Sequence, residues 1–97
     1  MAEPAAPLQP DGDPVLAQLR EQITDTDRAL VELVNKRLKL VERIKRYKQE
    51  RGLPFLDPAR EEWMLLYLTR ANRGPLSADG LRELYEEILD LTKREVD

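Results

Sequence analysis

The sequence contains neither cysteine nor histidine. Without cysteine, disulfides and thiolate metal sites are excluded, and without histidine the commonest general base and metal ligand is missing. There is also no glycine-rich phosphate loop, no calcium-loop spacing and no base that would activate a serine. Chemistry must therefore rely on Arg, Lys, Asp, Glu and hydroxyl groups, and we expect neither covalent nor metal catalysis.

Long apolar runs are absent as well, because nowhere do about 18 consecutive apolar residues occur. The N-terminal residues lack the basic and apolar regions of a secretory signal. Charged residues form 36% of the chain while the net charge is only -3, and interspersed signs of this kind are typical of solvated helix faces rather than of a nucleic-acid-binding surface. We expect a cytoplasmic protein that binds neither nucleic acid nor membranes.

The first twelve residues hold three prolines among small and polar residues. This composition buries too little apolar area to offset the entropy that is lost on ordering. We predict a disordered leader over residues 1–12 and one helical domain over residues 13–97. Asp13, followed by Pro14, has the pattern of an N-cap and a first helical residue.

One long amphipathic helix is predicted from Pro14 to about Gln49, because the segment after Pro14 has no glycine or proline and its apolar or tolerated residues recur at alternating steps of three and four. The stripe consists of Leu16, Leu19, Ile23, Thr26, Leu30, Leu33, Arg37, Leu40, Ile44 and Tyr47. A helix of about 36 residues is roughly 54 Å long, which exceeds the diameter of a compact domain of this size. The stripe needs a second chain, so we predict an intertwined homodimer.

Two shorter helices are expected after the long one. The glycine and proline of the segment 51–54 end the long helix. Asp57 precedes a proline and begins a second helix, which ends at about Arg73, and Ser77 begins a third. The predicted fold class is all-α, with a long, a short and a medium helix in each protomer.

Two cations of the long helix are candidates for binding an anion. Arg37 interrupts the stripe with a permanent charge, which is costly to bury without a partner. Lys48 follows 11 residues later, and 11 steps of about 100° bring both cations to nearly the same side of the helix. The alternative is that Arg37 extends its charge to solvent and that Lys48 is a surface lysine.

Three charged residues gather on one face at the start of the second helix, namely Asp57, Arg60 and Glu61. Asp57 is explained as an N-cap and Glu61 as an acid near the positive end of the helix dipole. Arg60 is explained less well, because a cation opposes the dipole there. On the third helix Tyr85 and Thr92 share one stripe, where such residues usually belong to the core.

A resemblance to the all-helical class of chorismate mutases is carried by the segment LAQLREQITDTDRALVELVNKRLKLVERIKRYKQERGLPFLDPAREEWML. It includes an LREQI start, a KR pair in mid-helix, a lysine eleven residues later and a D-x-x-R-E element, and it extends from about Leu16 to the C-terminus. The resemblance implies a dimer with paired first helices. It also implies the cofactor-free rearrangement of chorismate to prephenate, a step towards phenylalanine and tyrosine.

The resemblance assigns roles to three cations of the long helix. Arg37 would clamp one substrate carboxylate, and Lys48 would reach the ether oxygen and a carboxylate. Arg20 matches an arginine that the other subunit donates. Arg20 and Arg37 are 17 residues apart, roughly 25 Å along one helix, which is too far for one small ligand to bridge. We therefore expect two sites per dimer, each shared between the two chains.

The resemblance also assigns roles on the other two helices. Asp57 and Glu61 would receive the ring hydroxyl of the substrate. Arg60 would support the pocket that binds the anionic substrate, and Thr92 would lie near a substrate carboxylate. Domains of this family are often fused to, or bind, another shikimate-pathway enzyme, and we expect the same of this chain.

One position departs from the family pattern. The family commonly has glutamine or glutamate facing the ether oxygen where this sequence has Val96. A one-residue shift of the third helix would bring Glu95 into that role. A carboxyl there must be protonated to donate a hydrogen bond, so activity would favour lower pH.

Three other functions remain open at this point. An isochorismate pyruvate lyase shares the fold and a similar cationic pocket. A helical dimerisation or regulatory domain without catalysis is favoured by Val96. A helical nucleic-acid binder is the weakest alternative, because no helix face is predominantly basic.

Overall fold

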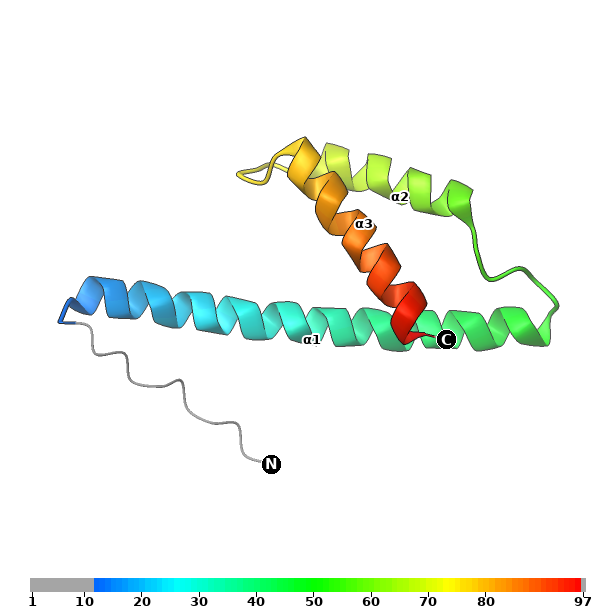
Figure 1. Ribbon diagram of the computed structural model, residues 1–97, viewed down its shortest axis with the longest axis horizontal. Coiled ribbons are helices and arrows are strands. Elements are labelled where there is room, and N and C mark those ends of the chain that lie inside the picture. The colour runs from blue at the N-terminus through cyan, green and yellow to red at the C-terminus, as the bar shows by residue number, and fades with distance from the viewer. Residues whose placement is uncertain (1–11, 97) are drawn as a thin grey trace, which may run out of the picture. The chain divides into compact units, whose positions relative to one another are not determined.

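The computed structural model describes residues 12–96. Three helices make up this part of the chain, α1 (Pro14–Glu50), α2 (Pro58–Ala71) and α3 (Ala78–Glu95), and no strand occurs among the described residues (Figure 1). The all-α prediction, with its order of long, short and medium helix, is confirmed. Most of the predicted leader, residues 1–11, lies outside the described residues. None of the three helices is long and apolar enough to cross a membrane.

Both ends of α1 form as the sequence predicts. The Asp13 carboxylate accepts hydrogen bonds from the backbone N–H groups of Val15, at 2.9 Å, and Leu16, at 3.3 Å, so it satisfies donors that lack partners within the helix. At the other end Gly52 has a φ of +66°, and the N–H of Leu53 returns to the carbonyl of Lys48 at 2.9 Å. This is the Schellman pattern, for which glycine is the favoured residue.

The caps of α2 and α3 are also the predicted ones. The Asp57 carboxylate accepts from the N–H of Arg60 at 3.1 Å, and the Ser77 hydroxyl accepts from the N–H of Gly80 at 3.0 Å. The predicted end of α2 at about Arg73 is two residues too late. Asn72 leaves the helical conformation because its side-chain amide donates to the carbonyl of Leu76 at 2.7 Å and its side-chain oxygen accepts from the following turn.

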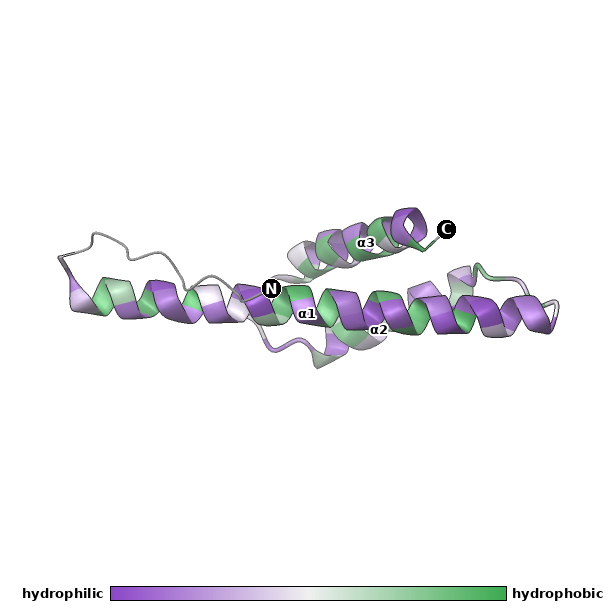
Figure 2. Ribbon diagram, turned by 90° about the horizontal axis from the view of Figure 1, so that it is seen from below, coloured by the Kyte–Doolittle hydropathy of each residue, from purple (hydrophilic) through white to green (hydrophobic). Residues whose placement is uncertain are grey.

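The described chain divides into two compact units, one that ends at Arg37 and one that begins at Leu38. In the first unit α1 is a single helix with no buried residue. Its apolar side chains are exposed, Leu33 by 61% for example, and Figure 2 shows them recurring between hydrophilic residues along α1. The stripe predicted from the sequence is therefore uncovered in the single chain.

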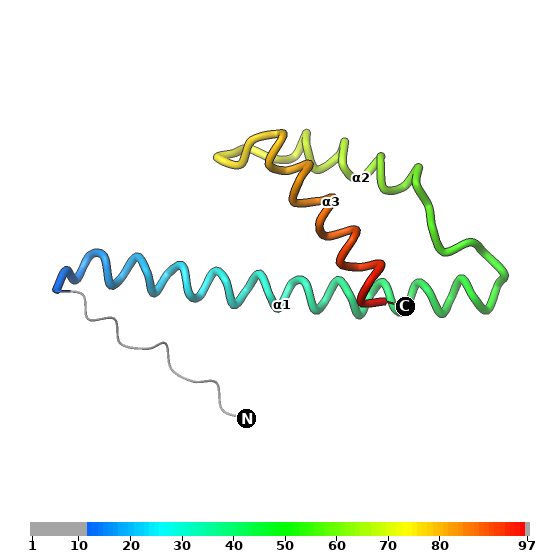
Figure 3. Tube along the Cα trace, in the orientation of Figure 1, coloured from blue at the N-terminus to red at the C-terminus, as the bar shows by residue number. Residues whose placement is uncertain are grey.

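The second unit holds the end of α1 together with α2 and α3. An ion pair of 3.6 Å between Glu61 and Lys93 joins α2 to α3. Figure 3 shows α3 leading back from the turn after α2 to α1, where Lys45 contacts Val96. Among the described residues the buried apolar side chains are Tyr85 and Val96. The small core of this unit therefore lies along one stripe of α3.

Candidate active site

Lys48 is held at the point where α1 ends. Its backbone carbonyl accepts from Leu53 in the helix cap, and its ammonium donates to the carbonyl of Phe55 at 3.2 Å. The side chain is half-buried. An ammonium has three N–H donors, so the bond to Phe55 fixes the position of the charge and leaves donors that can address a ligand.

The three charged residues at the start of α2 have distinct contacts. Asp57 is the N-cap, as its structural explanation predicted. The guanidinium of Arg60 lies 4.7 Å from the ring centroid of Trp63, and that ring stacks on Tyr67 at 5.5 Å. This cation–π contact explains how a cation is accommodated near the positive end of a helix. Glu61 is half-buried and pairs with Lys93.

The buried residues of α3 end with Thr92 and Val96, and Val96 is the position where the family commonly has glutamine or glutamate. Thr92 is 8% exposed, and its hydroxyl donates to the carbonyl of Ile88 at 2.6 Å. Val96 is 5% exposed, and its N–H donates to the carbonyl of Thr92 at 2.9 Å, four residues earlier, although Val96 itself is the non-helical C-cap of α3. Glu95 is exposed. In this structure the buried position therefore belongs to Val96, with no one-residue shift in the last turn.

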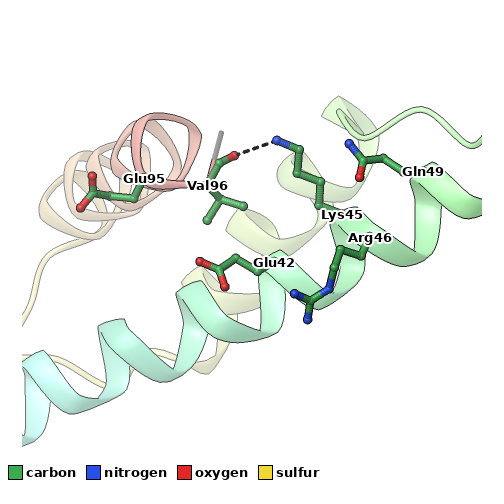
Figure 4. Close-up of a pocket in the computed structure, with 6 residues that line it drawn as sticks. All are labelled: Glu42, Lys45, Arg46, Gln49, Glu95 and Val96. Atoms are coloured by element: carbon green, nitrogen blue, oxygen red, sulfur yellow. Dashed lines mark hydrogen bonds between the residues drawn. The ribbon is translucent and has the colours of Figure 1, made fainter.

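A polar pocket of about 260 Å³ lies beside that end of α3 (Figure 4). It is lined by Glu42, Lys45, Arg46, Gln49, Glu95 and Val96. The ammonium of Lys45 donates to the backbone carbonyl of Val96 at 3.4 Å. Figure 4 shows the Val96 side chain directed towards α1, whereas the Glu95 carboxylate points away from Lys45.

Sequence reasoning did not single out Lys45. Its partner carbonyl is 51 residues away in the chain, and a lysine on a charged helix carries no local sign of such a contact. The only signal in the sequence is its place one turn before the end of α1.

The other two predicted cations, Arg20 and Arg37, lie in the first unit on α1. Arg20 is exposed and Arg37 is half-buried. Because α1 is helical throughout between them, their 17-residue separation corresponds to roughly 25 Å along the axis. A single small anion therefore cannot bind both cations of one chain.

The chemistry that these groups support is electrostatic. Among the described residues, no group of three or more acidic side chains could hold a metal ion. The candidate residues are cations, carboxylates with hydrogen-bond or ion-pair partners, and a buried hydroxyl. Groups of this kind can bind an anionic ligand in one conformation and stabilise negative charge that develops on it.

Comparison with known proteins gives consistent matches. The profile of the chorismate mutase type II family matches residues 19–96. The chain is 38% identical over 81 residues to the T-protein of Haemophilus influenzae, and 30% identical over 79 residues to the bifunctional chorismate mutase/prephenate dehydratase of Pseudomonas aeruginosa. These alignments cover 82% and 76% of this chain but 20% and 22% of the relatives, so the chain spans about a fifth of their length.

Solved structures match over most of their length. The form II structure of the chorismate mutase from Thermus thermophilus is 38% identical, with a TM-score of 0.78, and the match covers 81% of this chain and 90% of that one. The form I structure of the same enzyme gives 39% identity and a TM-score of 0.77, and the match covers 79% of this chain and 96% of that one. The resemblance inferred from the LREQI and D-x-x-R-E elements is confirmed. The chain belongs to the chorismate mutase type II family.

Proposed function

We propose that this chain catalyses the cofactor-free rearrangement of chorismate to prephenate. The observation that carries the proposal is the match to a chorismate mutase structure over 90% of that structure's chain, at a TM-score of 0.78. The residue types of the candidate site agree with it. The reaction breaks one C–O bond and forms one C–C bond within a single molecule, so it needs neither a nucleophile nor a proton carrier.

Catalysis requires two things of the protein. A flexible dicarboxylate must be held in a folded, chair-like conformation, and the negative charge that grows on the ether oxygen must be stabilised. In our proposal Arg37 binds one carboxylate through its planar guanidinium, which matches carboxylate geometry. Lys48 donates to the ether oxygen while its bond to Phe55 holds the ammonium in place.

The residues of α2 and α3 complete the proposed substrate site. Glu61, with Asp57 beside it, accepts a hydrogen bond from the ring hydroxyl, and its pair with Lys93 fixes the orientation of the carboxylate. Arg60 adds positive potential to the pocket from its position over Trp63. Thr92 contributes its buried hydroxyl near a substrate carboxylate.

We further propose that the active form is a homodimer in which Arg20 of one chain serves the site of the other. Two observations support this. The apolar stripe of α1 is exposed in the single chain, and burying such a stripe against a second copy removes it from water. The distance of roughly 25 Å between Arg20 and Arg37 along α1 also requires two chains if both bind one substrate.

A partner enzyme and a cellular location can also be proposed from the relatives. Relatives that match this chain include a bifunctional chorismate mutase/prephenate dehydratase. We therefore propose that this domain is fused to, or associates with, another enzyme of the shikimate pathway. A place in amino-acid biosynthesis favours the cytoplasm, with no role in binding nucleic acid or membranes.

The test is an assay of chorismate consumption by the 97-residue chain, with the product identified. We expect chorismate to disappear with formation of prephenate and no pyruvate. Pyruvate release from isochorismate, without turnover of chorismate, would favour the lyase. A folded dimer that transforms neither substrate would contradict catalysis and favour a regulatory domain.

The proposed role of Glu95 gives a separate prediction for pH. Glu95 would act only if the last turn of α3 shifted when substrate binds, and it would then donate through a protonated carboxyl. The rate should then be higher at low pH than at high pH, because an ionised carboxylate cannot donate a hydrogen bond. Glu95→Gln should flatten the profile, because an amide donates at every pH. Flat kcat profiles for both proteins would exclude this role for Glu95.

A further inference from the structure

Lys45 connects two segments that are distant in the chain. Its ammonium donates to the backbone carbonyl of Val96 at 3.4 Å (Figure 4). The same ammonium stands 5.6 Å from the ring centroid of Phe55. The side chain is half-buried. One cation of α1 therefore contacts both the end of α3 and the connection that leads to α2.

The carbonyl that Lys45 contacts needs a partner from outside its own helix. The last carbonyls of an α-helix have no N–H donor within the helix, and the helix dipole places partial negative charge there. Val96 is the C-cap of α3. Lysine side chains near a helix C-terminus satisfy such carbonyls and interact favourably with the dipole. Here the lysine comes from a different helix, so the contact also fixes the position of α3.

Val96, which Lys45 holds through its carbonyl, is also the buried residue at the end of α3. Val96 is 5% exposed, whereas the three preceding residues, Lys93, Arg94 and Glu95, are exposed. Val96 also lies one turn after Thr92, and its N–H donates to the Thr92 carbonyl. Release of the last turn would therefore disturb both buried residues at that end of the stripe.

We infer that Lys45 is a positioning residue, which anchors the end of α3 so that Val96 and Thr92 are correctly placed beside the reacting substrate. This inference rests on the proposed chorismate mutase activity. Val96 has no side-chain hydrogen-bond donor for the ether oxygen. In the observed arrangement of α3, in which Val96 is buried and Glu95 is exposed, the contribution of Val96 is to exclude water there, which strengthens the interaction between the Lys48 ammonium and the developing charge.

The specific contact of Lys45 can be distinguished from the effect of removing any positive charge from α1. Glu42 and Gln49 share its face of α1, one turn before and after it, and Arg46 and Glu95 line the same pocket. Among these side chains, Lys45 is the one whose hydrogen bond to Val96 is drawn in Figure 4. Lys39 provides a matched control, because it is an exposed lysine of α1 in the same unit.

The experiment compares Lys45→Met, Lys45→Arg and Lys39→Met with the unaltered chain. We measure kcat and KM for chorismate, the melting temperature, and hydrogen exchange at the amides of the last two turns of α3. We expect Lys45→Met to lower kcat about tenfold with KM changed less than about twofold, because a small displacement near the reacting atoms mainly affects the chemical step. Exchange at the end of α3 should accelerate in parallel. Lys45→Arg should restore most of the rate, and Lys39→Met should change neither quantity.

Three results would overturn the inference while the proposed function stands. These are an unchanged kcat in Lys45→Met, an equal loss in Lys39→Met, or accelerated exchange and a lower melting temperature with full activity per folded molecule. The last result would assign Lys45 a purely structural role. Absence of prephenate formation by the unaltered chain is a different outcome, which overturns the proposed function and the positioning role with it.

Discussion

Replacement of Lys48 by alanine is expected to lower kcat/KM for chorismate by about 10²- to 10³-fold, the usual cost of removing one group that stabilises developing negative charge in an enclosed site. The ammonium is fixed by its bond to the Phe55 carbonyl at 3.2 Å, so it needs little reorganisation when charge develops on the ether oxygen. Steady-state kinetics with purified protein measure this effect.

The stability of the same variant separates catalysis from structure. Lys48→Ala removes one hydrogen bond from a half-buried ammonium to a backbone carbonyl, which contributes about 1.5 kcal/mol to the free energy of unfolding. The helix cap around Gly52 uses the backbone of Lys48 and remains in place. Urea unfolding should therefore show a small change beside a large kinetic loss, and Lys39→Ala should show neither. If Lys48→Ala unfolds while activity per folded molecule is unchanged, Lys48 is a structural residue.

Mixing two inactive variants is expected to restore activity. Arg20→Ala and Arg37→Ala should each abolish nearly all turnover, because each removes a cation that binds a substrate carboxylate. In a dimer with shared sites, a mixed pair carries both losses in one site and leaves the other site intact. Random pairing makes about half of the dimers mixed, so about a quarter of the unaltered activity should return.

The measurement is turnover after the two variants are unfolded together and refolded at equal concentration. Each variant refolded alone is the control and should stay inactive. Sites built within single chains give the opposite result, because every chain in the mixture then lacks one arginine and no activity returns. Recovery well below a quarter, with mixed dimers demonstrated by mass spectrometry, would likewise contradict the role of Arg20 in the partner's site.

The sequence predicts the helices well because their signals are local. Asp13, Asp57 and Ser77 each cap the helix that they were expected to cap, since a short polar side chain can satisfy the first N–H groups wherever it occurs. The end of α2 was placed two residues too late because the side chain of Asn72 forms its own turn. That competition between side chain and helix has no distinctive pattern.

The candidate site is predictable only in part. The spacing of Arg37, Lys48 and the D-x-x-R-E element carries the family resemblance, and this resemblance assigned the roles. The contact between Lys45 and Val96 could not be predicted, because 51 residues separate the two and their meeting depends on how α3 packs. The position of Arg60 over Trp63 follows from an i, i+3 spacing on α2 that the sequence does contain.

The small core of the single chain has a consequence for the protein in the cell. Among the described residues only Tyr85 and Val96 are buried apolar side chains, and so few contribute only a few kcal/mol of hydrophobic stabilisation. If the stripes of α1 pair as proposed, folding and association form one equilibrium, and the folded fraction rises with the abundance of the protein. Fusion to a second domain that itself dimerises would raise the local concentration of α1, so that the fold persists even where the protein is scarce.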